Sequence, residues 1–269
     1  MTLLIGFAIG IVLGLTGAGG SVLAVPLLAV FLDLPATEAT GLALGVVAAS
    51  SLYGAVIRIV QKQVLWVPAL LFGISGMLFA PPGRWLSTLV DPWLLKAAFA
   101  ALSAIIAARM FWQSGTADEE LLHVRATSEP LAEVTLQCVQ SGNGSIDLRP
   151  RCLAGLVGGG VATGLLSGFF GVGGGFLIIP LLTQINRVPI RHAIATSLLI
   201  IAGISASGFA MQLLTQPTDM TLLPWLAIGG LAGMIAGHAL AKHIAGVALQ
   251  RIFAVTILLM AILLLTTRG

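Results

Sequence analysis

The chain contains the stretch Gly17-Ala18-Gly19-Gly20-Ser21-Val22-Leu23-Ala24-Val25-Pro26-Leu27-Leu28, and 154 residues later it contains Gly171-Val172-Gly173-Gly174-Gly175-Phe176-Leu177-Ile178-Ile179-Pro180-Leu181-Leu182. The same offset aligns residues 14–54 with 168–208 without a gap, at 14 identities in 41 positions. The protein is therefore a duplication. In each copy, glycines interrupt a hydrophobic segment near its middle, and in membranes such interruptions expose backbone that can bind a substrate.

The composition places the chain in a membrane. Of its 269 residues, 58% are hydrophobic and 9% are charged, and the mean hydropathy is +1.05, which is too apolar for a soluble domain of this size. The net charge of +3 fits the excess of Lys and Arg that membrane topology produces, so no nucleic-acid partner is expected. Six apolar runs reach the roughly 20 residues that a spanning helix needs: 36–59, 65–89, 92–112, 193–214, 222–241 and 248–266.

Two glycine-broken segments, residues 2–32 and about 153–186, remain outside these six runs. Each arm of the first segment makes only about 20 Å of helix at ~1.5 Å per residue, so it reaches little beyond the midplane of a ~30 Å hydrocarbon core. We therefore expect both segments to enter the membrane and return. The expected fold is an all-α integral membrane protein with two inverted repeats, each a glycine-broken re-entrant helical hairpin plus three transmembrane helices. Because no basic residue precedes the first segment, a cleaved signal peptide is not expected.

The positive charges favour this topology, because Lys and Arg gather in cytoplasmic loops. With re-entrant hairpins, the 13 Lys and Arg residues divide 10 to 3 between the two faces, whereas eight full crossings would divide them 7 to 6. We expect a first transmembrane repeat at 1–113, a cytoplasmic polar linker at 114–151 and a second repeat at 152–269, with both termini outside. Within the linker, residues 134–137 and 146–148 flank Ser141-Gly142-Asn143-Gly144, which predicts a small β-hairpin.

The two glycine breaks are the predicted substrate site. Each break precedes a half-helix, whose first N–H groups and positive dipole end attract anions, and two such ends facing each other across a pseudo-twofold axis would form one anion-binding pocket. The alternative is that the glycines only let helices pack closely. The candidate residues are Gly17, Ala18, Gly19, Gly20, Ser21, Gly171, Val172, Gly173, Gly174 and Gly175, with further hydroxyl donors at Ser50, Ser51, Thr196, Ser197 and Ser205.

Ionisable residues are scarce and fall near the ends of the spans. Arg58 and Arg84 are examples, and we expect such side chains to snorkel toward the membrane surface or to anchor the helices there. Glu38, His192 and His238 are the candidates for proton coupling, although a structural role is the preferred interpretation of each. A dianion that leaves a cell with an inside-negative potential of ~100 mV gains about 2 × 2.3 kcal/mol, so export requires no coupled ion.

The paired glycine turns, each followed by Pro-Leu-Leu, resemble those of the TauE/SafE sulfite exporters, also called the toluene sulfonate uptake permease family. Ala195-Thr196-Ser197-Leu198 and Gly229-Gly230-Leu231-Ala232-Gly233 add to the resemblance, which covers the chain apart from the linker. It implies a multi-pass transporter of small sulfur-containing anions in the bacterial inner membrane, with Gly17, Gly19, Gly20, Gly171, Gly173 and Gly174 at the motif positions. The first copy departs from the second at Leu42 and Ala43, where the second has Thr196 and Ser197, so the hydroxyl donors differ between the halves.

The leading hypothesis is a membrane transporter that exports sulfite, thiosulfate, sulfoacetate or another organosulfonate by alternating access. The alternative is an ion-coupled uptake permease for an organosulfonate or other organic anion, with a passive anion channel as a smaller possibility. No HExxH or membrane-embedded aspartate pair is present, so we do not expect an enzyme. No cofactor and no metal site are expected. The expected partners are the anion and the lipid bilayer, and a homodimer remains open.

Overall fold

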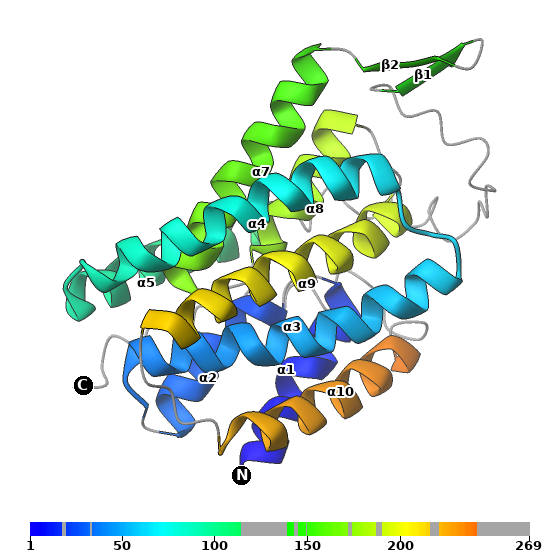
Figure 1. Cartoon of the computed structure of the whole chain (residues 1–269). Helices are drawn as coiled ribbons and strands as arrows, with labels where there is room; N and C mark the ends of the chain where they lie inside the picture. The colour runs from blue at the N-terminus through cyan, green and yellow to red at the C-terminus, as the bar shows by residue number, and fades with distance from the viewer. Residues whose placement is uncertain are drawn as a thin grey trace.

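The structure is a computed structural model that describes residues 1–17, 20–32, 34–113, 139–142, 145–148, 150–171, 174–186, 190–215 and 221–240 (Figure 1). The first half contains five helices, α1 (Thr2–Thr16), α2 (Gly20–Phe31), α3 (Ala36–Val60), α4 (Trp66–Thr88) and α5 (Pro92–Gln113). The second half contributes α7 (Pro150–Phe170), α8 (Gly175–Asn186), α9 (Ile190–Thr215) and α10 (Leu223–Leu240). The strands β1 (Val139–Gly142) and β2 (Ser145–Leu148) lie between the halves.

The prediction of an all-α integral membrane protein is confirmed. Among the described residues, five helices are long and apolar enough to cross a membrane: Thr37–Val60, Trp66–Thr88, Leu153–Phe170, His192–Thr215 and Leu223–Leu240. Four of them lie where spans were expected. The fifth is the main part of α7, which was expected to be a short re-entrant arm. The expected run at 248–266 lies outside the described residues.

The polar linker contains the predicted hairpin, but its first strand begins later in the chain than expected. β1 and β2 pair antiparallel, with Val139 opposite Leu148 and Gly142 opposite Ser145. Ser141 and Gly142, which were assigned to the turn, are therefore strand residues, and the expected first strand at 134–137 lies outside the described residues. The error arises because Asn143-Gly144 alone is a sufficient two-residue hairpin signal, so the strand can continue to Gly142.

Two helix pairs in the bundle are held together by rows of glycines. In α1, a Cβ added at Gly6, Gly10 or Gly14 would overlap a carbonyl oxygen of Leu226, Gly230 or Met234 of α10, respectively. The contacts advance in the same direction on both helices, so α1 and α10 run parallel. In the second copy, Gly160, Gly164 and Gly168 of α7 make the equivalent contacts with Phe72, Gly76 and Ala80 of α4. Both pairs therefore join the first helix of one half to the fourth helix of the other.

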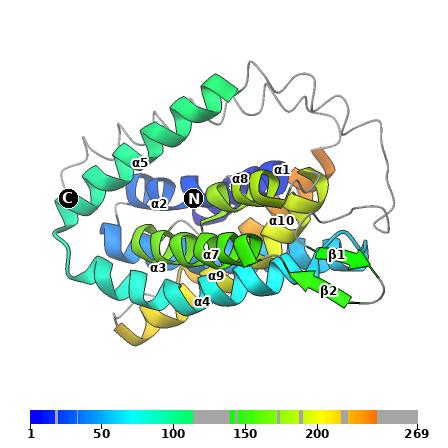
Figure 2. The ribbon, with the colours of Figure 1, turned by 90° about the horizontal axis from the view of Figure 1, so that it is seen from above.

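The third helix of each half, α3 and α9, lies against its counterpart through the middle of the molecule (Figures 1 and 2). A Cβ at Gly41 would meet Gln212, one at Gly45 would meet Phe209 and one at Gly54 would meet Leu198. Residue numbers fall along α9 as they rise along α3, so these two equivalent helices run antiparallel. The relation between the halves stays a prediction, and this antiparallel contact supports an inverted repeat.

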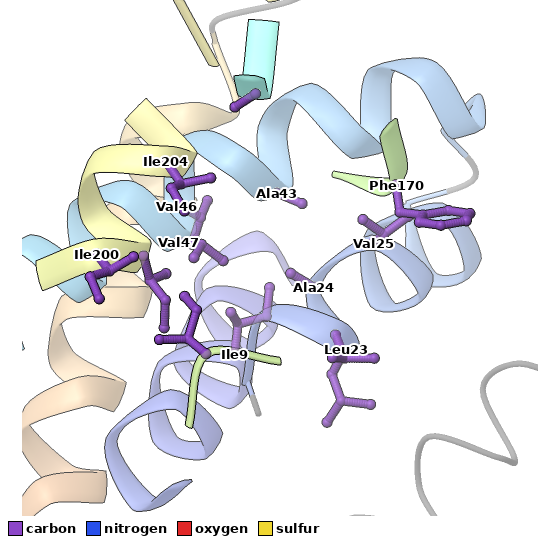
Figure 3. Close-up of a cluster of buried hydrophobic side chains, with 14 of the residues drawn as sticks. Ile9, Leu23, Ala24, Val25, Ala43, Val46, Val47, Phe170, Ile200 and Ile204 are labelled. Atoms are coloured by element: carbon purple, nitrogen blue, oxygen red, sulfur yellow. The ribbon is translucent and has the colours of Figure 1, made fainter. Parts of the chain in front are cut away.

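The buried core lies where the short helices meet the two central ones. Figure 3 shows Ile9 of α1, Val25 of α2 and Ala43 of α3 in one cluster with Phe170 at the end of α7 and Ile200 of α9. By contrast, large apolar side chains such as Trp66, Trp93 and Leu214 are exposed on the outside, as expected for a surface that faces lipid. The core therefore holds the glycine-broken segments against α3 and α9.

Candidate substrate-binding site

Both predicted glycine breaks are present, and they have the same local geometry. Gly17 ends α1 in the left-handed conformation, with φ of 72°, and its N–H donates to the carbonyl of Leu13 at 2.8 Å. Gly171 follows α7 with φ of 69°, and its N–H donates to the carbonyl of Ser167, also at 2.8 Å. Glycine adopts this conformation at little steric cost and terminates helices well. The repeated sequence therefore stops two helices in the same way.

The surroundings of the two breaks are also equivalent. A Cβ at Gly17 would overlap Ile194 of α9, and one at Gly171 would overlap Thr40 of α3, which are corresponding positions in the two copies. Thr40 marks the second break, and Gly54 lies near the first break. Both residues belong to α3, and about 21 Å of this helix separates them at ~1.5 Å per residue. The described residues therefore show the two breaks in separate surroundings, and the single pocket between facing turns stays a prediction. Ala18, Gly19, Val172 and Gly173 lie outside the described residues.

The helix starts that follow the breaks are closely packed. Gly20 begins α2 against the backbone of Leu13, where a side chain would not fit, and Ser21 is completely buried beside it. In the second copy Gly174 has φ of 65°, and Gly175 begins α8. The half-helices therefore start beside the ends of the helices that precede them, as the re-entrant interpretation requires.

The predicted hydroxyl donors have different roles in the structure. Ser51 donates to the carbonyl of Val47 in its own helix at 2.5 Å, and Thr196 accepts from the N–H of Leu65 at 3.0 Å, so both serve the protein's own backbone. Ser197 donates to the carbonyl of Ile194 at 2.9 Å and lies 3.5 Å from that of Gly17, which places it beside the first break. Ser50 and Ser205 are buried, and their hydroxyls have no hydrogen-bond partner in the described part of the chain.

Two further hydroxyls next to the second break were missed in the sequence. Thr163 and Ser167 are completely buried, and neither hydroxyl has a hydrogen-bond partner among the residues that the structure describes. A Cβ at Gly174 would contact both side chains. Their spacing of four residues on α7 puts them on one helix face, and this face was the signal that could have revealed them. Buried unpaired hydroxyls usually need a partner, so these two are candidate donors to a substrate.

A cavity lies beside the first break and contains two basic side chains. Its empty volume is about 280 Å³, which includes open space at its mouth, and its enclosed part has room for about one water molecule. Arg58 of α3 donates from Nη1 to Oε1 of Gln63 at 2.6 Å, and its Nη2 lies 3.4 Å from Nδ1 of His238 of α10. The cavity is lined by Gly14, Gly17, Gly54, Ile57, Arg58, Ile194, Leu198, Met234 and His238.

The other two candidates for proton coupling have structural surroundings. His192, near the start of α9, is buried and places Nδ1 2.9 Å from the carbonyl of Gln63. Glu38 lies in the first turn of α3, where its N–H donates to the carbonyl of Pro35. An acidic side chain at that position suits the positive end of the helix dipole. Of the three candidates, only His238 lines the cavity.

Arg84 does not snorkel, contrary to the expectation for a residue near the end of a span. It lies within α4 and is 0% exposed. Its Nε donates to Oε1 of Gln212 of α9 at 2.5 Å, its Nη1 to Oγ of Ser87 at 3.0 Å and its Nη2 to the carbonyl of Thr37 at 3.0 Å. Oγ of Ser87 also donates to the carbonyl of Arg84. The side chain stays inside because α9, α3 and its own helix each supply an acceptor for the guanidinium.

A duplicated pair of glycine breaks, held inside a bundle of long apolar helices, defines a multi-pass membrane protein of the transporter class. The chain matches the family described as "Sulfite exporter TauE/SafE" over residues 2–264, and it belongs to that family. The resemblance inferred from the glycine motifs is thereby confirmed, and the protein is a membrane transporter.

Curated relatives support the same class. The chain is 29% identical over 264 residues to a probable membrane transporter protein of Xylella fastidiosa (strain 9a5c), covering 96% of this chain and 91% of that protein. It is 26% identical over 241 residues to the probable membrane transporter protein YdhB of Bacillus subtilis (strain 168), covering 88% of each. A probable membrane transporter protein of Methanocaldococcus jannaschii is 27% identical over 228 residues, covering 81% of this chain and 73% of that protein. No solved structure matches the chain.

Proposed function

We propose that the protein exports a small sulfur-containing anion, such as sulfite, thiosulfate, sulfoacetate or another organosulfonate, across the bacterial inner membrane. One observation carries the proposal: the cavity beside the first break is lined by the guanidinium of Arg58, the imidazole of His238 and the left-handed Gly17. The family match supports the substrate class.

The chemistry of this cavity suits an oxyanion. The planar guanidinium of Arg58 can donate two parallel hydrogen bonds to sulfonate or sulfite oxygens, and such charge-assisted bonds are roughly twice as strong as neutral ones. The start of α2 next to the break adds the positive end of a helix dipole. Since the enclosed space has room for about one water molecule, the site must widen before an anion can enter.

Alternating access between two inverted halves provides that widening. The antiparallel contact of α3 with α9 and the parallel pairs α1–α10 and α4–α7 support halves of opposite orientation. In this proposal the linker 114–151 lies in the cytoplasm and both termini lie outside. Export of a dianion would draw on the membrane potential, which is worth about 2.3 kcal/mol per charge at 100 mV.

Ion-coupled uptake is the second candidate, and the position of His238 favours it. This imidazole lines the cavity next to Arg58, where a histidine can bind and release a proton within the physiological pH range. An uptake permease would use that proton to bring an organosulfonate or another organic anion in against the membrane potential. Its flux would collapse with the proton gradient, whereas potential-driven export would not.

A binding measurement on the purified protein tests the site. Sulfite, thiosulfate, sulfoacetate, sulfate, acetate and chloride are compared at fixed ionic strength for their effect on the melting temperature in detergent, because a ligand specific to the native state stabilises it by RT ln(1 + [L]/Kd). We expect at least one sulfur anion to stabilise the protein, with a half-saturating concentration at least tenfold higher in Arg58→Gln. Lys62→Asn, which removes a cation from an exposed turn with φ of 54°, is the charge-matched control and should bind like the wild type. Equal binding by Arg58→Gln would contradict the site.

A further inference from the structure

Arg84 is a buried cation whose partners are all neutral. Among the described residues, its guanidinium bonds the amide oxygen of Gln212, the hydroxyl of Ser87 and the carbonyl of Thr37, and no carboxylate joins them. An ionised group inside a membrane protein is costly, and it usually pairs with another charge or with backbone carbonyls. Such groups in membrane spans usually mark a substrate or ion pathway. The charge of Arg84 is therefore unexplained by its role in joining α4 to α3 and α9.

The repeat relates Arg84 to the basic pair in the cavity. The offset of 154 residues places Arg84 at the position of His238, and it places Gln212 at the position of Arg58. At one junction between the halves the bonded pair is Arg84 of α4 with Gln212 of α9, and at the equivalent junction it is Arg58 of α3 with His238 of α10. Each junction therefore has one arginine, which comes from the third helix at one junction and from the fourth helix at the other.

Both junctions adjoin a glycine break through the same backbone contacts. A Cβ at Gly14, three residues before Gly17, would contact the backbone nitrogen of His238, and one at Gly168, three residues before Gly171, would contact that of Arg84. The unpaired hydroxyl of Ser167 lies on the same stretch of α7. The surroundings of Arg84, next to the second break, are thus the counterpart of the cavity that contains Arg58.

We propose that Arg84 forms a second anion-binding station, which serves the opposite-facing state of the transporter. This inference rests on the proposed function, because it requires an anion that passes between the two halves. In the conformation described, Gln212 and the carbonyl of Thr37 hold the guanidinium. When the second break opens, a small oxyanion replaces these neutral acceptors and supplies the missing negative charge. Arg58 and Arg84 then contact the anion in turn, one at each end of its path.

Four variants, one of them the single change Arg84→His, separate this role from that of a helix clamp. Arg84→Gln retains hydrogen-bonding capacity but loses the charge, and Arg84→Lys retains the charge but loses the planar fork. The double variant Arg84→His, Gln212→Arg copies the Arg58–His238 arrangement to the junction next to the second break. Flux of the sulfur anion that stabilises the wild type is measured in proteoliposomes, and the melting temperature without anion is measured for each variant.

A binding role predicts an order of activities set by charge. We expect Arg84→Gln to lower the flux at least tenfold, Arg84→Lys to keep more flux than Arg84→Gln, and the double variant to recover at least half of what Arg84→His alone loses. A clamp predicts the reverse order for the single variants, because the amide of Gln can donate to the same acceptors without burying a charge. Flux in Arg84→Gln that equals or exceeds that of Arg84→Lys, at equal amounts of folded protein, would overturn the proposal.

Failure of the station can be distinguished from failure of the proposed function. If the wild type transports no sulfur anion but does transport a carboxylate, the proposed substrate is wrong, and the order of the Arg84 variants can still be tested with that carboxylate. If the wild type transports a sulfur anion and Arg84→Gln transports it at the same rate, the substrate stands and the second station is wrong.

Discussion

Gly17 and Gly171 each end a helix in a conformation that other residues adopt only at a cost. Their φ values are 72° and 69°, and a Cβ would also overlap Ile194 or Thr40. We expect Gly17→Ala and Gly171→Ala to destabilise the protein by at least about 1–2 kcal/mol each, the cost of the left-handed conformation alone. The measurement is the melting temperature in detergent without anion.

Gly158→Ala is the matched control for both variants. Gly158 lies in α7, and nothing approaches within 4 Å of a Cβ built there, so alanine should leave stability unchanged or raise it by up to about 1 kcal/mol. If all three variants melted at the same temperature, the breaks would not need glycine, and the equivalence of the two sites would lose its physical basis.

At the residue scale, the sequence predicted the glycine breaks but not the contacts that the basic side chains make. The glycine breaks can be recognised in a single sequence, because the need for glycine comes from its own backbone conformation and not from a partner residue. Arg84 was expected to snorkel, since its main partner Gln212 lies 128 residues away in the other copy. The alignment of the copies contained a signal for this pairing, because extending the same offset beyond residue 54 relates Arg58 to Gln212 and Arg84 to His238.

At the scale of elements, the glycine rows set how closely α1 approaches α10 and α7 approaches α4. A Cβ at Gly10 would overlap the carbonyl of Gly230, and one at Gly164 would overlap that of Gly76. Overpacking of this kind costs about 1–3 kcal/mol. Gly10→Ala and Gly164→Ala should therefore lower the melting temperature by similar amounts, because they occupy equivalent positions. A large loss in one variant with none in the other would contradict the equivalence of the two helix pairs.

Helix bounds could be predicted closely, whereas helix contacts could not. α3 begins at the residue expected and ends one residue late, and α4 is one residue shorter than expected at each end, because apolar length and flanking polar residues determine a span. The length of α7 was underestimated because its first residues, Pro150 and Arg151, were assigned to the linker. Which helices touch depends on the close approach of glycine faces, and a single sequence does not identify the partner face.

At the scale of the whole molecule, the charge distribution and the antiparallel α3–α9 contact support the same inverted topology. In a background with serine at Cys138 and Cys152, Thr2→Cys and Ser141→Cys place single thiols at the N-terminus and in β1. A membrane-impermeant maleimide added to intact cells should label Thr2→Cys only, and in inside-out vesicles it should label Ser141→Cys only. If both thiols were labelled from the same side, the first half would cross the membrane an even number of times, and the inverted repeat would be wrong.

The central claim is that the protein carries a sulfur oxyanion past Arg58, and flux from proteoliposomes tests it most directly. Vesicles loaded with labelled sulfite, thiosulfate or sulfoacetate are given an inside-negative potassium diffusion potential, with no proton or sodium gradient. We predict that at least one of these anions leaves at a rate that follows the potential and exceeds the rate from loaded liposomes without protein. This efflux should fall at least tenfold in Arg58→Gln but not in Lys62→Asn. Potential-driven export would be contradicted if all three anions left no faster than from loaded liposomes without protein. It would also be contradicted if transport appeared only with a proton or sodium gradient.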